Sequence, residues 1–258
     1  MSAYQQGPFT PKVTPVVKSL LIVLVAFFVL QFILDRLFGL PFTQQLAFTP
    51  FLFVQGKFWQ LATYILLHGS PFHLFFNALA LFMLGPQLES LWGSKKFLKY
   101  FFVTAFGGAI LHTFIWVLSL FFFPSQAAEL GLIPIVGSSG ALYGLLMAYG
   151  LLYGDSYFLA FFVFPIKARY FVLIIAAIEL FSSFGSGNEG VAHLVHLGGL
   201  ITGLIYLKIS GSKNGRGGGG SFFGRKKSMS KDEVRQRLSV ITNNNPSKGD
   251  KGLPITWN

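Results

Sequence analysis

Long apolar runs, separated by short polar or glycine-rich segments, dominate the sequence. We predict that six of these runs are membrane-spanning helices, at residues 19–34, 72–91, 100–123, 138–153, 170–184 and 191–207. A helix needs about 20 apolar residues to cross the hydrocarbon core of a bilayer, so the fourth run is a short span. The pattern therefore predicts an all-α membrane protein, a bundle of six transmembrane helices.

The segments between the runs refine this picture. Residues 38–70 mix apolar residues with prolines, Lys57 and Trp59, which is typical of a segment that lies in the membrane interface. Asp35 and Arg36 follow the first run without a small-residue cleavage site, so a retained helix is favoured over a signal peptide. Lys95, Lys96 and Lys99 predict a basic loop between the second and third spans, and residues 185–190 predict a glycine-rich turn.

Composition supports a membrane protein and excludes several kinds of site. The chain is 53% hydrophobic and only 11% charged, whereas soluble domains carry about 25% charged residues. It has no cysteine, so a disulfide framework, a thiol nucleophile and a cysteine metal site are all excluded. The net charge is +11, but basic residues flank the apolar runs, which indicates orientation in the membrane and anionic lipid rather than nucleic acid.

The distribution of charge predicts three parts. Residues 1–18 form a cytosolic N-terminal arm, residues 19–208 the six-helix membrane domain, and residues 209–258 a flexible basic cytosolic tail. A capping-box pattern at 230–233 leaves open a short surface helix in that tail. Both termini are then cytosolic, with Arg36 and Lys57 as exceptions, and the absence of a targeting presequence favours a bacterial inner membrane.

The candidate chemistry begins with Ser139, which stands at the start of the fourth run inside a glycine-rich stretch. Each glycine costs a helix about 1 kcal/mol relative to alanine, so the glycines indicate a close approach of another helix. On the sixth run His196 shares one face with two glycines. We predict that the two glycine faces meet and bring His196 to Ser139, the packing residues being Gly140, Gly144, Gly199 and Gly203.

Other polar residues fit the same chemistry. Tyr143, one turn after Ser139, is placed to stack on the imidazole of His196. Acyl transfer needs donors aimed at the developing oxyanion, and the first backbone N–H groups of the fourth run are one source. His73 and Asn77 are four residues apart, hence on one helix face. They are either further donors or a structural hydrogen bond between helices.

These motifs together resemble the rhomboid family of intramembrane serine proteases. Gly137-Ser-Ser139-Gly matches the family's GxSG motif, His196-x-x-Gly-x-x-x-Gly203 its last helix, and His73-x-x-x-Asn77 its second. Glu89-Ser-Leu-Trp-Gly-Ser94 resembles the turn after that second helix, and the resemblance covers residues 19–208.

The resemblance implies roles for individual residues. Ser139 is the nucleophile and His196 the general base of a Ser–His dyad, without a third acidic member. His73, Asn77 and the amide of Ser139 line the oxyanion site, and Tyr143 orients the base. The family often has an arginine after the tryptophan ahead of the second span, whereas Gln60 follows Trp59 here. This difference bears on the anchoring of the outer loop.

Four further polar residues have roles that the motifs do not assign. His193 is either an alternative to His196 as the general base or a polar residue at the mouth of the site. The second role is favoured because no glycine follows His193 at the spacing found after His196. His68 is expected to brace the outer loop, and His112 to bond a neighbouring helix. Glu179 is expected near the outer end of the fifth span, either at the membrane interface or beside the substrate route.

Three functions compete. The first is an intramembrane serine endopeptidase that cleaves transmembrane protein substrates without a cofactor. The second is a catalytically silent rhomboid-like protein that binds membrane helices. The third is a metal-dependent enzyme that uses His73, His193 and His196. The third is disfavoured because the last two histidines are three apart with no intervening glutamate, unlike an H-E-x-x-H helix, so no metal site is predicted.

Overall fold

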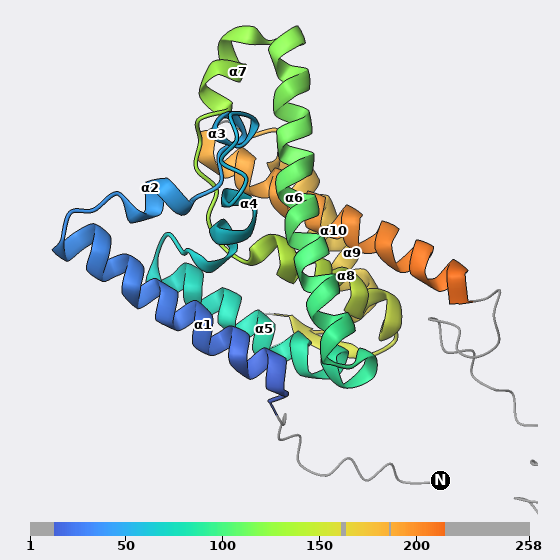
Figure 1. Ribbon diagram of the computed structural model, residues 1–258. Helices are drawn as coiled ribbons and strands as arrows, with labels where there is room; N and C mark the ends of the chain where they lie inside the picture. Colours follow the sequence, from blue (N-terminus) through green and yellow to red (C-terminus); the bar gives the residue numbers. More distant parts are fainter. Residues whose placement is uncertain (1–12, 161–163, 186, 215–258) are drawn as a thin grey trace, which may run out of the picture.

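The computed structural model describes residues 13–160, 164–185 and 187–214 (Figure 1). In this part of the chain four helical segments are long and apolar enough to cross a membrane. They are α1 (Pro15–Phe32) with its π-helical continuation η1 (Ile33–Leu37), α5 (Pro71–Trp92), α6 (Ser94–Phe122) and α10 (Gly187–Asn214). The prediction of a mostly helical membrane protein is confirmed.

Two of the six expected spans are shorter than the rest. The helices α8 (Ser139–Leu152) and α9 (Ala168–Ser182) have 14 and 15 residues. At 1.5 Å per residue each is about 21–23 Å long, less than the roughly 30 Å of a hydrocarbon core. Length alone therefore supports four crossings.

Short helices occupy two of the connecting segments. Residues 38–70 hold four of them: α2 (Phe42–Leu46), α3 (Pro50–Val54), α4 (Gln60–Thr63) and the 3-10 helix η2 (Tyr64–Leu66). A fifth, α7 (Pro124–Leu130), follows α6. An isolated β-bridge joins Phe48 to Ile135, so the loop of residues 38–70 is tied to the segment that leads into α8. Gln60 is fully buried; its side chain accepts from the Thr49 N–H and donates to the Gln45 carbonyl. Gln60, which follows Trp59 where rhomboids often have an arginine, thus anchors this loop through its amide group.

A β-hairpin between α8 and α9 was not predicted. Strands β1 (Tyr157–Ala160) and β2 (Phe164–Lys167) are antiparallel, with Tyr157 opposite Lys167 and Ala160 opposite Phe164. No element was predicted between the fourth run, which ends at residue 153, and the fifth, which begins at residue 170. The strands are four residues each, too short for alternation of polar and apolar residues to show against an apolar background.

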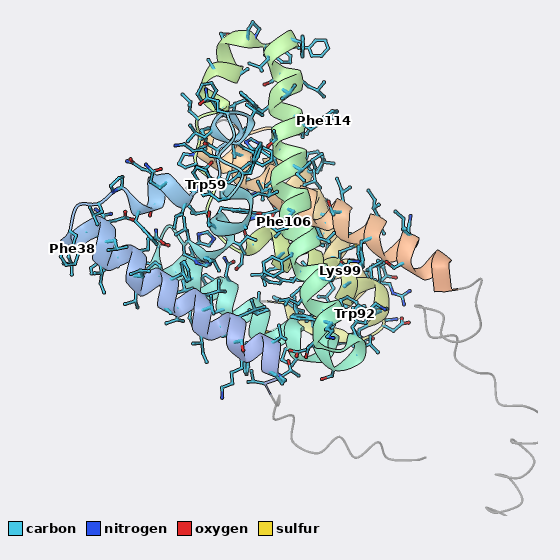
Figure 2. All side chains as sticks on the ribbon, in the orientation of Figure 1. Phe38, Trp59, Trp92, Lys99, Phe106 and Phe114 are labelled. Carbon is cyan, nitrogen blue, oxygen red and sulfur yellow. The ribbon has the colours of Figure 1, made fainter. Side chains whose placement is uncertain are left out.

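Helix α8 lies at the centre of the packing. It contacts α5, α6, α9 and α10, while α1 packs on α5 and runs beside it (Figure 1). The outer surface is strongly apolar: Phe38 beyond α1 and Phe114 on α6 are both more than half exposed, and Figure 2 shows side chains of this kind around the bundle. Such a surface suits a lipid surrounding rather than water.

The predicted basic loop between the second and third spans is wrong. Lys95, Lys96 and Lys99 lie in the first turns of α6. The connection from α5 to α6 is Gly93 alone, with a φ of 77° that favours glycine. Helix α10 continues to Asn214, and the division of the chain into arm, membrane domain and tail stays a prediction. The N-terminal arm up to residue 12, and the tail from residue 215 with its capping-box segment, lie outside the described residues.

A buried carboxylate holds the beginning of α1 against the end of α5. Glu89, 3% exposed, accepts hydrogen bonds from the backbone N–H groups of Val16 and Val17 at 3.1 and 3.0 Å, and from the Ser94 hydroxyl at 2.6 Å. Thr14, the N-cap residue of α1, makes no side-chain cap. Glu89 therefore satisfies free donors at the positive end of the helix dipole in place of a local cap.

We expect Glu89→Ala to lower the free energy of unfolding by about 2 kcal/mol, because three donors lose a charged acceptor. Thermal unfolding in detergent micelles measures the change. Ser90→Ala, at the exposed neighbouring position, is the control and should unfold like the wild type. Equal unfolding temperatures for Glu89→Ala and the wild type would contradict this account of α1.

Candidate active site

The segment that leads into α8 is fixed from two sides. The N–H of Gly137 donates to the carbonyl of Tyr64 at 2.9 Å, next to the bridge between Phe48 and Ile135. Gly137 has a φ of 114°, a conformation that other residues rarely adopt, and a Cβ there would lie 2.7 Å from the His73 ring. Glycine is thus required for both conformation and room, two residues before Ser139.

Helices α8 and α10 touch backbone to backbone. A Cβ added at Gly199 would lie 2.0 Å from the carbonyl oxygen of Gly140, and one at Gly203 would lie 3.3 Å from the Cα of Gly144. The structure brings together all four glycines that the sequence analysis paired. Tyr100 of α6 reaches the same contact and donates its hydroxyl to the Gly144 carbonyl at 2.7 Å.

This contact sets a serine beside an imidazole. The Oγ of Ser139, at the first residue of α8, lies 2.8 Å from the Nε2 of His196 on α10. The rings of Tyr143 and His196 are stacked, with centroids 4.2 Å apart and an angle of 7° between planes. A hydroxyl in this position can lose its proton to Nε2, which is what turns serine into a nucleophile.

A carboxylate that the sequence analysis did not assign to the site lies on the other side of His196. Glu179 of α9 is 4% exposed, and its Oε2 lies 3.2 Å from the Nδ1 of His196 and 2.6 Å from the Nδ1 of His193. The Tyr143 hydroxyl donates to its Oε1. The expectation of simple interfacial placement is wrong; the available signal was a lone carboxylate in an apolar helix.

His73 and Asn77 face the entrance of α8 from α5. Each lies near the position of a Gly137 Cβ, at 2.7 Å for His73 and 3.5 Å for the Nδ2 of Asn77. The hydroxyl of Ser70 accepts from the His73 N–H at 3.1 Å and so caps α5. The first N–H groups of α8 have no partner within their own helix, so donors from two helices converge near Ser139.

His68, in the loop ahead of α5, holds Asn77. Its Nε2 lies 3.0 Å from the Nδ2 of Asn77, and burial lowers the pKa of the His68 imidazole to about 4. The neutral ring therefore accepts one amide hydrogen of Asn77, and the other remains available. The backbone of His68 is in turn fixed by the side chain of Gln31, through bonds of 3.1 Å to its N–H and its carbonyl.

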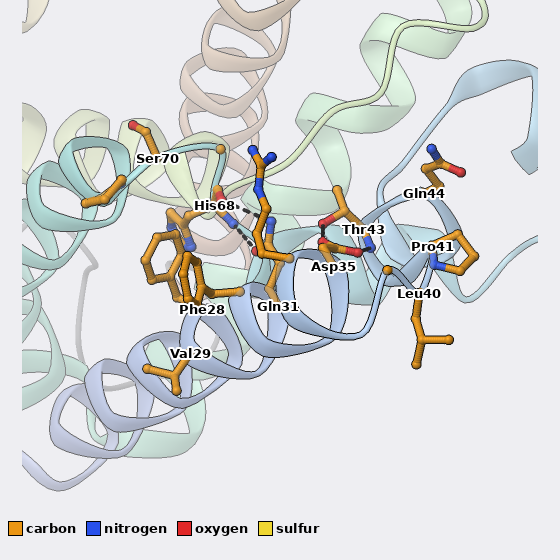
Figure 3. A pocket seen from close by; sticks show the side chains of 15 residues that line it. Phe28, Val29, Gln31, Asp35, Leu40, Pro41, Thr43, Gln44, His68 and Ser70 are labelled. Atoms are coloured by element: carbon orange, nitrogen blue, oxygen red, sulfur yellow. Dashed lines mark hydrogen bonds between the residues drawn. The ribbon is translucent and has the colours of Figure 1, made fainter.

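A cavity of about 1210 Å³ lies on the α1 side of this loop (Figure 3). Residues from α1, η1, the start of the 38–70 loop and positions 68–71 line it, and Ser139 and His196 do not. Figure 3 shows the pair of bonds between Gln31 and His68 and, next to it, the contact of Asp35 with Thr43. The cavity therefore lies beside the contacts that hold the loop of residues 38–70, and it is not part of the site around Ser139.

One group of side chains among the described residues has the geometry of a metal site. The ligand atoms of Glu179, His193 and His196 lie within 4.8 Å of one another. His73, which the metal-enzyme hypothesis included, is not in this group. The same atoms already hydrogen-bond one another, so a metal ion would have to replace those bonds.

The prediction for His112 is wrong. This residue of α6 is 1% exposed, and in the described structure neither of its ring nitrogens has a hydrogen-bond partner. The expected bond to a neighbouring helix is therefore not made. The hydroxyl of Ser138, which is fully buried next to Ser139, also has no hydrogen-bond partner in the described part of the chain.

Comparison with known proteins agrees with the motifs. Residues 55–213, more than half of the chain, match the Rhomboid domain. Rhomboid protease GluP of Bacillus subtilis is 34% identical over 154 residues, which cover 60% of this chain and 26% of that protein. Rhomboid protein 1, mitochondrial, of Saccharomyces cerevisiae is 29% identical over 140 residues, covering 54% and 38%. Putative rhomboid protease YdcA of Bacillus subtilis is 28% identical over 158 residues, covering 59% and 69%.

The chain belongs to the rhomboid family and is an integral membrane protein. The matched region spans about a quarter of GluP and about two fifths of the yeast protein. The similarity therefore concerns the membrane domain that contains the site, and not those whole proteins.

We expect Gly199→Ala to lower the free energy of unfolding by about 1–3 kcal/mol, because its Cβ meets a backbone oxygen that no rotamer change can move. Thermal unfolding in detergent is the measurement. Ile201→Ala is the control, since that side chain is 40% exposed on the same helix. If Gly199→Ala were no less stable than Ile201→Ala, the close contact of α8 and α10 would be wrong.

Proposed function

We propose that this protein is an intramembrane serine endopeptidase that cleaves transmembrane segments of other membrane proteins. Ser139 is the nucleophile and His196 is the general base. The observation that carries the proposal is the 2.8 Å contact between the Ser139 Oγ and the His196 Nε2 at the beginning of α8. Relatives named as rhomboid proteases, GluP and YdcA, support the same reaction class.

The reaction follows from the positions of the donors and acceptors. The Oγ of Ser139 attacks the carbonyl carbon of a substrate peptide bond while its proton passes to the Nε2 of His196. The negative charge that develops on the carbonyl oxygen is stabilised by the Ser139 N–H, His73 and the free amide hydrogen of Asn77. The protonated His196 then gives its proton to the leaving amine, and water hydrolyses the acyl-enzyme by the reverse sequence.

The short α8 supports cleavage below the membrane surface. In this proposal α8 and α9 are the fourth and fifth of six spans, with both termini in the cytosol of a bacterial cell. A helix of about 21 Å whose end reaches the cytosolic face begins inside the outer half of a bilayer. Ser139 then lies at that depth, and the polar residues around it line a water-filled cavity open to the outer face, as irregular backbone within a membrane requires.

The substrate reaches Ser139 between α5 and α9. Both helices present large exposed side chains, among them Phe72, Phe76, Leu173 and Phe181. A helical substrate must unwind locally, because its peptide carbonyls are otherwise hidden in hydrogen bonds. The first outer loop, residues 38–70, moves aside to admit it. The basic C-terminal tail, outside the described residues, binds anionic lipid.

Ser139→Ala should abolish cleavage of a model transmembrane substrate in liposomes, because it removes the hydroxyl that His196 contacts. Wild-type activity should be blocked by a serine-reactive phosphonate and should survive chelation of metal ions. If wild type cleaved several substrates no better than Ser139→Ala, the silent, helix-binding alternative would be correct. Loss of activity on chelation, with indifference to the phosphonate, would instead support a metal enzyme.

Asn77→Ala should lower kcat by about 10²–10³-fold and leave KM nearly unchanged, since an oxyanion donor acts mainly in the transition state. Steady-state kinetics in detergent separates the two constants. Asn77→Asp, which keeps the size but replaces the donor with an acceptor, should be at least as inactive. A kcat of Asn77→Ala equal to that of the wild type would remove Asn77 from the oxyanion site.

A further inference from the structure

We propose that Glu179 is a positioning residue that orients His196, so that the site works as a Ser139–His196–Glu179 triad rather than as a dyad. The inference rests on the proposed function. It assigns a role in the reaction to a side chain from α9, a helix that carries neither the nucleophile nor the base.

The first line of support is the geometry of the imidazole. The Nδ1 of His196 lies 3.2 Å from the Oε2 of Glu179, and its Nε2 lies 2.8 Å from the Oγ of Ser139. A carboxylate only accepts, so the Nδ1 of His196 carries the proton in this pair. The lone pair of Nε2 is then free to accept the serine proton, which is the tautomer that a general base needs.

The second line of support is that the carboxylate is itself held in place. Tyr143 donates its hydroxyl to the Oε1 of Glu179 and stacks its ring on His196. Tyr143, Glu179 and His196 thus form a closed set of three contacts. A carboxylate 4% exposed and fixed on both oxygens loses little freedom when His196 takes up a proton during the reaction.

The third line of support is the placement of Glu179 on its helix. Ala168, Val172 and Glu179 are the residues of α9 that are buried, and the first two lie in its first two turns. Later in α9 the neighbours Ile178, Leu180 and Phe181 are all at least 45% exposed. A charged group would avoid this apolar setting unless a partner offset the cost of burial. That partner is the pair of histidines on α10.

The chemistry needs no additional reactant. When Ser139 attacks, its proton moves to Nε2 and the imidazole becomes a cation. Glu179 keeps its charge and stabilises that cation through the Nδ1–H bond. The proton leaves again on the amine of the departing peptide, so Glu179 neither gains nor loses one.

The rival explanation is that Glu179 only ties α9 to α10 through His193, whose Nδ1 lies closer to Oε2, at 2.6 Å. The two explanations differ in what His193 contributes. If Glu179 acts on His196, removal of the His193 ring leaves the carboxylate to His196 alone. If Glu179 serves only the link to His193, removal of either partner has the same effect.

The test compares Glu179→Gln, Glu179→Asp and His193→Ala with wild type and Ser139→Ala in purified full-length protein. Each variant is assayed for kcat and KM on a transmembrane substrate, for the rate of labelling by a fluorophosphonate probe, and for thermal unfolding. Glutamine keeps the shape but presents an amide that can hold His196 in the wrong tautomer. Aspartate keeps the charge on a shorter side chain.

We expect Glu179→Gln to lower kcat by about 10²-fold or more with KM nearly unchanged, and to slow probe labelling in parallel. Glu179→Asp should recover part of kcat, and His193→Ala should keep most of it. A Glu179→Gln variant with the wild-type kcat would overturn the inference. So would equal losses of kcat in Glu179→Gln, Glu179→Asp and His193→Ala that track their unfolding temperatures.

These outcomes are distinct from a failure of the proposed function. If wild type neither cleaves a substrate nor is labelled by the probe at Ser139, the protease assignment fails and the role of Glu179 fails with it. If wild type is active and Glu179→Gln matches it in kcat and in labelling, the protease assignment stands and only the triad is wrong.

Discussion

The contact between α8 and α10 is the constraint on which the site depends. Ser139 and His196 are far apart in the sequence, and neither helix could place them at hydrogen-bond distance if side chains separated the backbones. The contact is made where Gly140 meets Gly199, so close that a Cβ at Gly199 would overlap a carbonyl oxygen. In a membrane, where apolar surface offers little drive for helix association, such close van der Waals packing is a main source of attraction. The same feature therefore stabilises the bundle and sets the geometry of the serine and the imidazole.

The parts of the fold that follow from local patterns could be predicted from the sequence. Apolar runs identified the long helices α1, α5, α6 and α10, because a bilayer requires about 20 apolar residues in a row. Glycine spacing identified which faces of α8 and α10 meet, since residues four apart lie on the same face of a helix. Boundaries were less certain: the basic residues after Gly93 read as a loop, yet charges on one face of a helix end at the membrane surface cost little.

The parts that depend on contacts between distant segments could not be predicted in this way. Glu179 was noticed as a carboxylate in an apolar helix, but nothing local to α9 indicates that it reaches His196 on another helix. The same holds for Gln60, whose bonds to Thr49 and Gln45 form only once the loop of residues 38–70 is folded. The β1–β2 hairpin is short and lies in an apolar background, so its period of two is hidden. His112 shows the reverse case, because a polar residue in a helix need not have a polar partner.

Two sets of contacts hold described polar residues near the serine, one on each side of it. Gln31 of α1 fixes the backbone of His68, His68 accepts from Asn77, and Asn77 faces Gly137 at the entrance of α8. On the other side Glu179 joins Tyr143 to both histidines of α10. A polar group in an apolar surrounding is costly unless it is bonded, so each member limits where its neighbour can lie. In the proposed reaction, donors that are fixed in this way before the substrate arrives do not have to be reoriented during the chemical step.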